Sequence, residues 1–267
     1  MYYNLFWALL KRIFDGKKYV ITEHSTIYYS KLKYWKKLFY RLISRFSEAI
    51  LPVSRRLQKA MEENGIKGDF YIIPNVVDTK LFTPKDNIKN DKTIFLHLSM
   101  LLDDHKNISG QLEAAKILND SCYEFEYLIG GNGDNTMILD FIEKNDLQNT
   151  IKTFGALSHS EVAKIMRDAD AFILFSNREN QPCVIIESFS AGTPVIATDV
   201  GGVIEYFPVG FGELISAKDI DSLIEKMKDI IDGKSYESPE KMHQYVEDNF
   251  SEIVIANQFN DIYQKMI

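Results

Sequence analysis

Short apolar runs alternate with amphipathic segments through residues 91–235. The runs predict strands at 93–99, 123–130, 151–155, 171–176, 194–199 and 212–215. Helical spacing predicts helices near 108–119, 135–145, 159–168, 183–191, 219–231, 238–248 and 251–266, with Ser251 as the N-cap of the last one. Strands without polar alternation that are separated by helices are typical of a parallel, doubly wound α/β sheet. Such a sheet binds ligands in the loops at the carboxyl ends of its strands.

The first 85 residues also have α/β character, with predicted strands at 19–22, 49–53 and 70–73. Three strands are few for an independent Rossmann-type half, in which each βαβ unit takes about 30 residues. The polar segment 83–91 contains Pro84 and is the best candidate for a linker. We therefore expect one domain at residues 1–85, a second at 86–250, and a C-terminal helix at 251–267 that packs back toward the first domain.

The composition, with 45% hydrophobic and 26% charged residues, is that of a globular protein. Two cysteines, Cys122 and Cys183, give no disulfide framework, which favours a reducing cytoplasm. No apolar run reaches the ~18 residues that a membrane span requires. The apolar residues 5–10 have positive charges after them and none before, which argues against a signal peptide.

The net charge of -7 is unevenly distributed, because residues 1–56 carry twelve Lys or Arg and three acidic residues. Residues 31–46 predict an amphipathic helix. Its apolar positions are Leu32, Trp35, Leu38, Phe39, Leu42 and Phe46, and its basic positions are Lys33, Lys36, Lys37, Arg41 and Arg45. For the apolar side chains we favour packing against the sheet. For the charges we favour an anionic membrane surface over nucleic acid, since bulky aromatics alternate with the basic residues.

The loop and helix after the predicted strand 171–176 carry the most informative chemistry. Residues 176–187 read Ser-Asn-Arg-Glu-Asn-Gln-Pro-Cys-Val-Ile-Ile-Glu, and Pro182 stands where the first helical turn begins. The helix N-terminus offers free amides and partial positive charge to an anion. Glu179 in the loop and Glu187 one turn into the helix reach the same crevice, where carboxylates suit vicinal sugar hydroxyls. Taken singly, each Glu is more simply an ordinary surface carboxylate.

The whole segment resembles the signature of the family 4 retaining glycosyltransferases, which have the GT-B fold of two facing Rossmann-like domains. Four further stretches match the family in order: 73–84 (Ile-Pro-Asn-Val-Val-Asp leading to Phe82 and Pro84), 128–133, 153–155 and the glycine-rich turn 192–202. The resemblance covers about residues 19–267. It implies an α/β fold of GT-B type, with a complete C-terminal Rossmann-like domain and a partial N-terminal one.

The resemblance also implies a donor-binding role for the loop and helix. Glu187 would hold the donor ribose, and Glu179, as a catalytic residue, would hold hydroxyls of the transferred sugar. The neighbouring residues that would meet sugar or phosphate, chiefly through backbone amides, are Asn180, Gln181, Pro182 and Cys183.

Other loops supply the remaining residues of the implied site. Lys106 matches the lysine that neutralises the donor diphosphate, where a point charge stabilises the departing nucleotide. His24, the second catalytic candidate, matches an N-domain histidine near the sugar. Gly155 and Ala156 would line the base pocket. Without the resemblance, Lys106 is more simply a solvated lysine and His24 a structural residue at a strand end.

The sequence departs from the family pattern in two places. The family pairs its lysine with an arginine five residues earlier, and here Leu101 takes that position, removing a bidentate phosphate contact. The chain also begins inside what would be a helix of the acceptor domain, whose first glycine-rich loop has no counterpart. The sequence therefore predicts an N-terminally truncated acceptor domain, as a fragment, a short gene product or a protein completed by a partner.

The resulting hypothesis is transfer of a hexose, with retention, from a nucleoside diphosphate sugar to a glycan or lipid-linked acceptor in surface polysaccharide biosynthesis. We expect a cytoplasmic protein, peripheral at the inner face of the membrane, without a nucleic-acid partner. No metal or other cofactor is expected, since Asp168 and Asp170 lie at a helix end where caps and turns are common. The alternative is a catalytically impaired nucleotide-sugar-binding or scaffolding module. A nucleotide-sugar epimerase is a third hypothesis without motif support.

Overall fold

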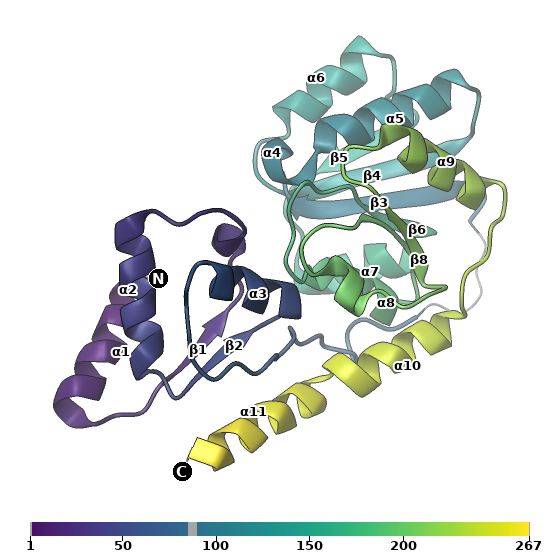
Figure 1. The fold of residues 1–267 in the computed structure, drawn as a ribbon. Coiled ribbons are helices and arrows are strands. Elements are labelled where there is room, and N and C mark those ends of the chain that lie inside the picture. The colour runs from purple at the N-terminus through teal and green to yellow at the C-terminus, as the bar shows by residue number, and fades with distance from the viewer. Residues whose placement is uncertain (1, 85–89, 267) are drawn as a thin grey trace. The chain divides into compact units, whose positions relative to one another are not determined.

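The computed structural model describes residues 2–84 and 90–266, and the chain divides into two compact units (Figure 1). Unit 1 comprises Met1–Asn75 and Ile255–Ile267, and unit 2 comprises Val76–Val254. The predicted domain boundary between residues 85 and 86 lies outside the described residues, as does most of the predicted linker.

Unit 2 is built, within its described residues, on a six-stranded parallel sheet in the order β5-β4-β3-β6-β7-β8. The strands are β3 (Thr93–Met100), β4 (Phe125–Asn132), β5 (Ile151–Phe154), β6 (Ala171–Leu174), β7 (Val195–Thr198) and β8 (Gly212–Ile215). The predicted strands of this region are all confirmed to within two residues at each end. Continuous apolar runs form these strands because both faces of a parallel sheet are buried.

Helices cover both faces of this sheet. They are α4 (Asp103–Lys106), α5 (Ile108–Asp120), α6 (Thr136–Lys144), α7 (His159–Asp168), α8 (Cys183–Ser190), α9 (Ile220–Ile231) and α10 (Pro239–Phe250), with a 3-10 turn η2 (Val203–Tyr206). Successive residues of β3 enter different cores: Phe95 packs with Leu112 of α5, and Leu96 packs with Met166 of α7 and Phe189 of α8. Figure 1 shows α5 and α9 together over one face of the sheet. The predicted doubly wound arrangement is confirmed.

The strand order changes direction between β3 and β6. Their pairing is short, with Phe95 beside Ala171 and Leu96 beside Phe172, although β3 continues to Met100. The loops that follow the two strands therefore leave from adjacent strand ends. This is the switch point at which doubly wound sheets bind ligands.

Unit 1 contains a two-stranded parallel sheet of β1 (Val20–Glu23) and β2 (Ala49–Pro52). The other elements are α1 (Tyr2–Asp15), the 3-10 turn η1 (Thr26–Tyr29), α2 (Tyr34–Phe46), α3 (Arg55–Glu63) and α11 (Glu252–Met266). Ile255 and Ile262 of α11 pack with Leu51 of β2. Ser251, predicted as the N-cap of the last helix, is the C-cap of α10 and directly precedes α11, which begins at Glu252.

The predicted strand at 70–73 is wrong, because Phe70 forms an isolated bridge with Ile50. The Ile50 N–H donates to the Asp69 carbonyl at 2.8 Å, and the Tyr71 N–H donates to the Ile50 carbonyl at 3.0 Å. The next bond of a parallel ladder would need an N–H from residue 52, and Pro52 has none. The Ile73 N–H still donates to the Pro52 carbonyl at 3.2 Å, so the segment keeps a hydrogen bond to β2 but forms no second bridge.

The prediction that the apolar side of segment 31–46 packs against the sheet is largely wrong. The helix begins at Tyr34, and its buried side is formed by Tyr40, Ile43 and Ser44. Leu32 and Phe39 of the predicted set are partly buried against the unit 1 core. The rest of the set is exposed, namely Trp35, Leu38, Leu42 and Phe46. A helical stripe is a local property, whereas the face that is covered depends on neighbouring elements.

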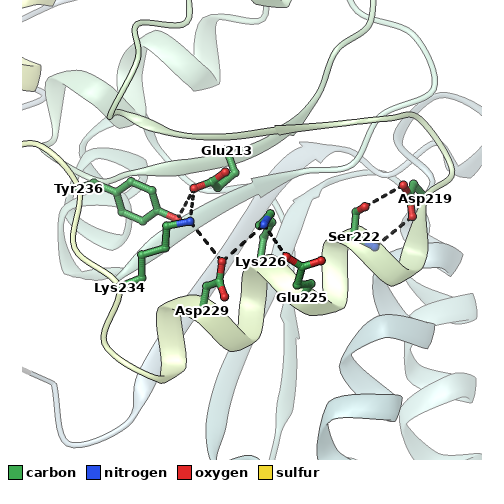
Figure 2. Close-up of polar contacts among 8 residues, drawn as sticks. All are labelled: Glu213, Asp219, Ser222, Glu225, Lys226, Asp229, Lys234 and Tyr236. Carbon is green, nitrogen blue, oxygen red and sulfur yellow. Dashed lines mark hydrogen bonds and ion pairs between the residues drawn. The ribbon is translucent and has the colours of Figure 1, made fainter.

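A polar network connects β8, the edge strand of the sheet, to α9 (Figure 2). Lys234 Nζ lies 2.5 Å from Glu213 Oε1 on β8 and 3.2 Å from Asp229 Oδ2 on α9. The Tyr236 hydroxyl donates to Glu213 at 3.4 Å. The hydrogen bond to Glu213 raises the pKa of Lys234. Charged side chains on an edge strand also oppose pairing with another sheet.

Candidate functional site

Lys106 and Glu179 meet at the switch point, although 73 residues separate them. Lys106 ends α4, which follows β3, and Glu179 lies in the loop between β6 and α8. Lys106 Nζ is 2.5 Å from Glu179 Oε1, and the two side chains are 19% and 10% exposed. A charge pair that is largely buried, yet keeps some exposure to solvent, is only weakly screened.

The turn that carries Lys106 is fixed by bonds to its surroundings. Gln111 Nε2 donates to the Lys106 carbonyl at 2.9 Å, and the Asn177 N–H donates to the His105 carbonyl at 2.7 Å. Asn107 follows with φ 48°, in the left-handed region that asparagine tolerates better than most residues. The hydrogen bond from Asn177 connects this turn to the loop after β6. It therefore holds the segment that carries Lys106 next to the segment that carries Glu179.

The loop that carries Glu179 rests on the predicted glycine-rich turn. Glu179, Asn180 and Gln181 are all buried. Gly201 has φ 55°, and a Cβ at this position would lie 1.8 Å from the Glu179 carbonyl oxygen. The Gly202 N–H donates to the Asn180 carbonyl at 2.9 Å. Only glycine allows the backbone of the turn to come this close to the Glu179 carbonyl. The turn therefore packs directly against the loop that carries Glu179.

The helix α8 begins at Cys183, as the predicted range 183–191 has it, but Pro182 precedes the first helical turn instead of standing in it. Pro182 is the N-cap, with an extended ψ of 117°, and Cys183 is the first helical residue. Pro182 makes no side-chain cap hydrogen bond, so the first turn keeps N–H groups for an anion. Burial, together with the Glu187 charge, raises the pKa of the Cys183 thiol to about 11. That shift disfavours a nucleophilic thiolate.

Glu187 lies one turn into α8, and its side chain is 14% exposed. Its Oε1 is 3.5 Å from Nε2 of His159, the first residue of α7. Burial raises the pKa of Glu187, and the contact with His159 opposes that increase. The sequence did not point to His159. The neighbouring Ser-x-x-Glu pattern at Ser158 indicates a helix start and gives no sign of a contact with α8.

A second residue missed by the sequence reasoning is His97, which lies on β3 beneath the switch point. Its Nδ1 is 2.8 Å from the Ile173 carbonyl on β6, and its Nε2 is 2.8 Å from Ser99 Oγ. The ring therefore links β3 to β6 just past their last paired residues. Burial lowers the pKa of His97 to about 4. The available signal was a single histidine within an apolar run.

The remaining predicted site residues lie elsewhere. Gly155 and Ala156 are exposed in the loop between β5 and α7, which leads to His159. His24 belongs to unit 1, where it follows β1, is exposed and has Nδ1 2.9 Å from Asn75 Oδ1. The carboxylate of the adjacent, buried Glu23 accepts the N–H groups of residues 24 and 25 and the Tyr28 hydroxyl. The structure thus brings Lys106 to Glu179, leaves Gly155 and Ala156 in the loop before α7, and places His24 in the other unit.

Leu101, in the position of the family arginine, is buried in the core cluster that also contains Ile129. Its N–H donates to the Asn132 carbonyl at 2.8 Å. Asp170, half of the Asp-x-Asp pattern, accepts the Ile94 N–H at 2.8 Å and so has a structural role at the start of β3.

Residues 2–84 and 90–266 contain neither a candidate membrane span nor a candidate metal site. No helix in that part of the chain is long and apolar enough to cross a membrane. No group of three or more His, Cys, Asp or Glu side chains there is arranged to hold a metal ion.

Comparison with protein families gives matches along nearly the whole chain. The glycosyl transferases group 1 profile matches residues 78–249, which include the predicted donor residues of unit 2. The chain belongs to this family. The profile of Glycosyltransferase Family 4 matches residues 1–81.

Curated relatives are longer than this chain. A phosphatidylinositol N-acetylglucosaminyltransferase subunit of Arabidopsis thaliana is 23% identical over 264 residues, covering 97% of this chain and 59% of the relative. The amylovoran biosynthesis glycosyltransferase AmsK of Erwinia amylovora is 26% identical over 201 residues, covering 71% of this chain and 46% of the relative. The chain therefore spans about half the length of these relatives.

Solved structures share the fold at low sequence identity. Sucrose-phosphate synthase of Thermosynechococcus elongatus matches with a TM-score of 0.84 and 19% identity, covering 99% of this chain and 72% of that one. HepE of Anabaena, solved in complex with UDP, matches with a TM-score of 0.86 and 16% identity, covering 99% and 77%. The predicted α/β fold with parallel, Rossmann-like sheets is confirmed, and it matches glycosyltransferase structures of the GT-B type.

Proposed function

We propose that the protein transfers a hexose from a nucleoside diphosphate sugar to a hydroxyl of a glycan or lipid-linked acceptor, with retention of configuration. The observation that carries the proposal is the Lys106–Glu179 ion pair at the switch point of the sheet. The uncapped N-terminus of α8 and the buried Glu187 provide an anion site and a hydroxyl acceptor on the same element. HepE, a solved neighbour, was crystallised with UDP-glucose, which supports a donor of this class.

Each residue of the unit 2 cluster then has a chemical role. Lys106 binds the donor diphosphate and stabilises the negative charge that develops as the glycosidic bond breaks. Glu179 accepts hydrogen bonds from hydroxyls of the transferred sugar, and Glu187 accepts those of the ribose. The acceptor hydroxyl attacks on the face that the diphosphate leaves, and the departing diphosphate takes its proton. Without donor, Lys106 and Glu179 neutralise each other, so neither charge stays unpaired at the buried site.

The acceptor and the role of His24 rest on resemblance. Two relatives are named for transfer to phosphatidylinositol and for synthesis of the polysaccharide amylovoran, which supports both lipid-linked and glycan acceptors. His24, as a second catalytic residue, would bond the sugar through its imidazole, and its place at a strand end supports that role. No metal or other cofactor is proposed for the reaction.

Calorimetry tests donor binding. UDP-glucose, UDP-N-acetylglucosamine and GDP-mannose are titrated into the wild type and into Lys106→Met. A hydrogen bond to a charged group contributes about 1.5–3 kcal/mol, so we expect Lys106→Met to weaken the preferred donor at least about tenfold. Lys152→Met is the matched control. Lys152 Nζ lies 2.9 Å from Glu126 Oε1, and this ion pair joins β5 to β4, not the strands of the switch point. Absence of binding by every donor would contradict the proposal.

Turnover is tested on the same donor by release of the nucleoside diphosphate. We expect Glu179→Gln to lower kcat strongly while the protein still binds donor, because an amide has one acceptor oxygen where the carboxylate has two. Full turnover by this variant would exclude the proposed role of Glu179. Glu126→Gln removes a carboxylate of similar type from the control pair and should leave kcat unchanged.

A second candidate function is a nucleotide-sugar-binding module without transferase activity. The observation that favours it is the burial of Leu101 in the core, where the family has a phosphate-binding arginine. Lys106 and the helix N-terminus then bind the diphosphate without a guanidinium. Donor binding without turnover, even when lipid-linked and glycan acceptors are supplied, would favour this module over the enzyme.

We also propose that unit 1 associates with an anionic membrane surface from the cytoplasmic side. Trp35, Leu38 and Leu42 are exposed on α2, beside the basic Lys37 and Arg45. Attraction to anionic lipid is about 1 kcal/mol per basic residue. Sedimentation with phosphatidylglycerol vesicles should therefore exceed that with phosphatidylcholine vesicles, and Lys37→Gln with Arg45→Gln should reduce the difference. Equal sedimentation with both lipids would contradict this part of the proposal.

A further inference from the structure

His159 lies in a defined position beside the carboxylate that is proposed to bind ribose. Ser158 caps α7, and a capping box with Glu161 fixes where the helix begins. The imidazole packs edge-to-face on buried Phe82, with ring centroids 5.1 Å apart. On its other side, Nε2 is 3.5 Å from Glu187 Oε1. The ring is thus held between a buried aromatic side chain and a buried carboxylate.

The two side chains differ in their exposure to solvent. The His159 side chain is 62% exposed, whereas the Glu187 side chain is 14% exposed. Because His159 Nε2 lies 3.5 Å from Glu187 Oε1, a ligand that binds Glu187 would lie close to the imidazole. The capping box is made by Ser158 and Glu161, so the helix start does not depend on the His159 side chain.

We propose that His159 is a positioning residue for the nucleoside end of the donor, and that it orients Glu187 to recognise the ribose hydroxyls of a ribonucleoside diphosphate. In this arrangement the imidazole N–H donates to Glu187 Oε1. The second carboxylate oxygen keeps its lone pairs for the ribose. The inference rests on the proposed donor-binding function and extends it to a residue outside the matching motifs.

The ionisation state of Glu187 explains why this carboxylate needs a hydrogen-bond donor such as His159 beside it. A carboxylate accepts hydrogen bonds through both oxygens only when it is ionised, and protonation converts one oxygen into a donor. Burial raises the pKa of Glu187 and so favours the protonated form, whereas the hydrogen bond and charge of His159 act in the opposite direction. Cys183, one turn earlier, supplies no positive charge. His159 therefore favours the ionised form of Glu187, which can accept from a diol, against the larger effect of burial.

The experiment compares ligands that differ in one ribose hydroxyl. Calorimetry measures the affinities of UDP and 2′-deoxy-UDP, or of the corresponding guanosine pair if GDP binds more tightly. 2′-Deoxy-UDP lacks the hydroxyl that would donate to the Glu187 carboxylate. Loss of a hydrogen bond to a charged group lowers affinity at least about tenfold, so the wild type should bind UDP more tightly by that factor. Glu187→Gln should lose most of this discrimination.

The variants at position 159 separate positioning from a structural role. His159→Ala should reduce the discrimination to less than about threefold, because Glu187 loses its partner. His159→Gln should restore most of it, since its amide can donate to the carboxylate. Lys164→Ala, an exposed position on the same helix, is the control and should bind both ligands like the wild type. Melting curves of all variants check that α7 and α8 remain folded.

The possible failures are distinguishable. If His159→Ala keeps the wild-type discrimination, or weakens UDP and 2′-deoxy-UDP equally, the inference is overturned and the proposed function stands. If the wild type binds neither UDP nor GDP, the proposed function fails and the inference fails with it.

Discussion

Acidification from pH 7 to pH 5 is expected to destabilise unit 2 through His97. The ring is fully buried on β3, and its Nδ1 lies 2.8 Å from the Ile173 carbonyl on β6. Burial disfavours the charged imidazolium and lowers the pKa of His97 to about 4. In the unfolded chain the same ring has its ordinary pKa of about 6.5. The unfolded state therefore binds the proton more tightly than the folded state does.

The sign and size of the effect follow from this difference. A depressed folded-state pKa gives stability that is complete above the unfolded pKa and is lost as the pH falls toward the folded pKa. Between pH 7 and pH 5 these two pKa values predict that His97 alone lowers the free energy of unfolding by about 2 kcal/mol. His97→Gln retains an N–H donor for the Ile173 carbonyl but does not titrate, so its loss over the same interval should be smaller by that amount.

The assay is amide hydrogen exchange of peptides that contain β3, measured near pH 7 and pH 5 and corrected for intrinsic exchange rates. Tryptophan fluorescence is unsuitable, because Trp7 and Trp35 both belong to unit 1. His243→Gln is the matched control: His243 Nδ1 lies 2.8 Å from the Ser190 carbonyl, but the side chain is only half-buried. An acid-induced loss in His97→Gln equal to that of the wild type would refute the reasoning.

Three further substitutions test the supports of the site and the sheet edge. Gly201→Ala should weaken UDP binding at least about tenfold, because its Cβ would lie 1.8 Å from the Glu179 carbonyl, and unchanged affinity in calorimetry would contradict this support role. Leu101→Arg should lower the melting temperature by placing a charge at a core position, yet tighten UDP binding by restoring a guanidinium, and unchanged affinity in calorimetry would contradict the second effect. Lys234→Met should cost about 0.5–1 kcal/mol in urea unfolding near neutral pH, since the side chain is 37% exposed. Its raised pKa means that this contribution is complete below about pH 10 and is lost only at higher pH, so a contribution that disappears when the pH is raised from 7 to 9 would contradict it.

Local patterns in the sequence predict the unit 2 elements well, and unit 1 shows where they fail. Apolar runs and helical spacing depend on a few neighbouring residues, so strands such as β3 and helices such as α8 are recovered nearly to the residue. The strand predicted at 70–73 failed because Pro52, on another segment, cannot supply the next N–H of the ladder. The exposed Trp35 and Leu38 show the same limit, since a helical stripe does not specify its partner.

For the candidate site, the sequence by itself determined which chemical groups stand at strand ends: Lys106 after β3, and Glu179 and Glu187 around the start of α8. The tertiary structure decided which of them meet. The strand order brings β3 beside β6, and only then does an ammonium group lie 2.5 Å from a carboxylate 73 residues away. The same holds for His159, whose partner Glu187 lies on α8, and for the contact of His97 with the Ile173 carbonyl on β6. Residue type and spacing are local properties, whereas burial, pairing and pKa depend on contacts that only the folded chain makes.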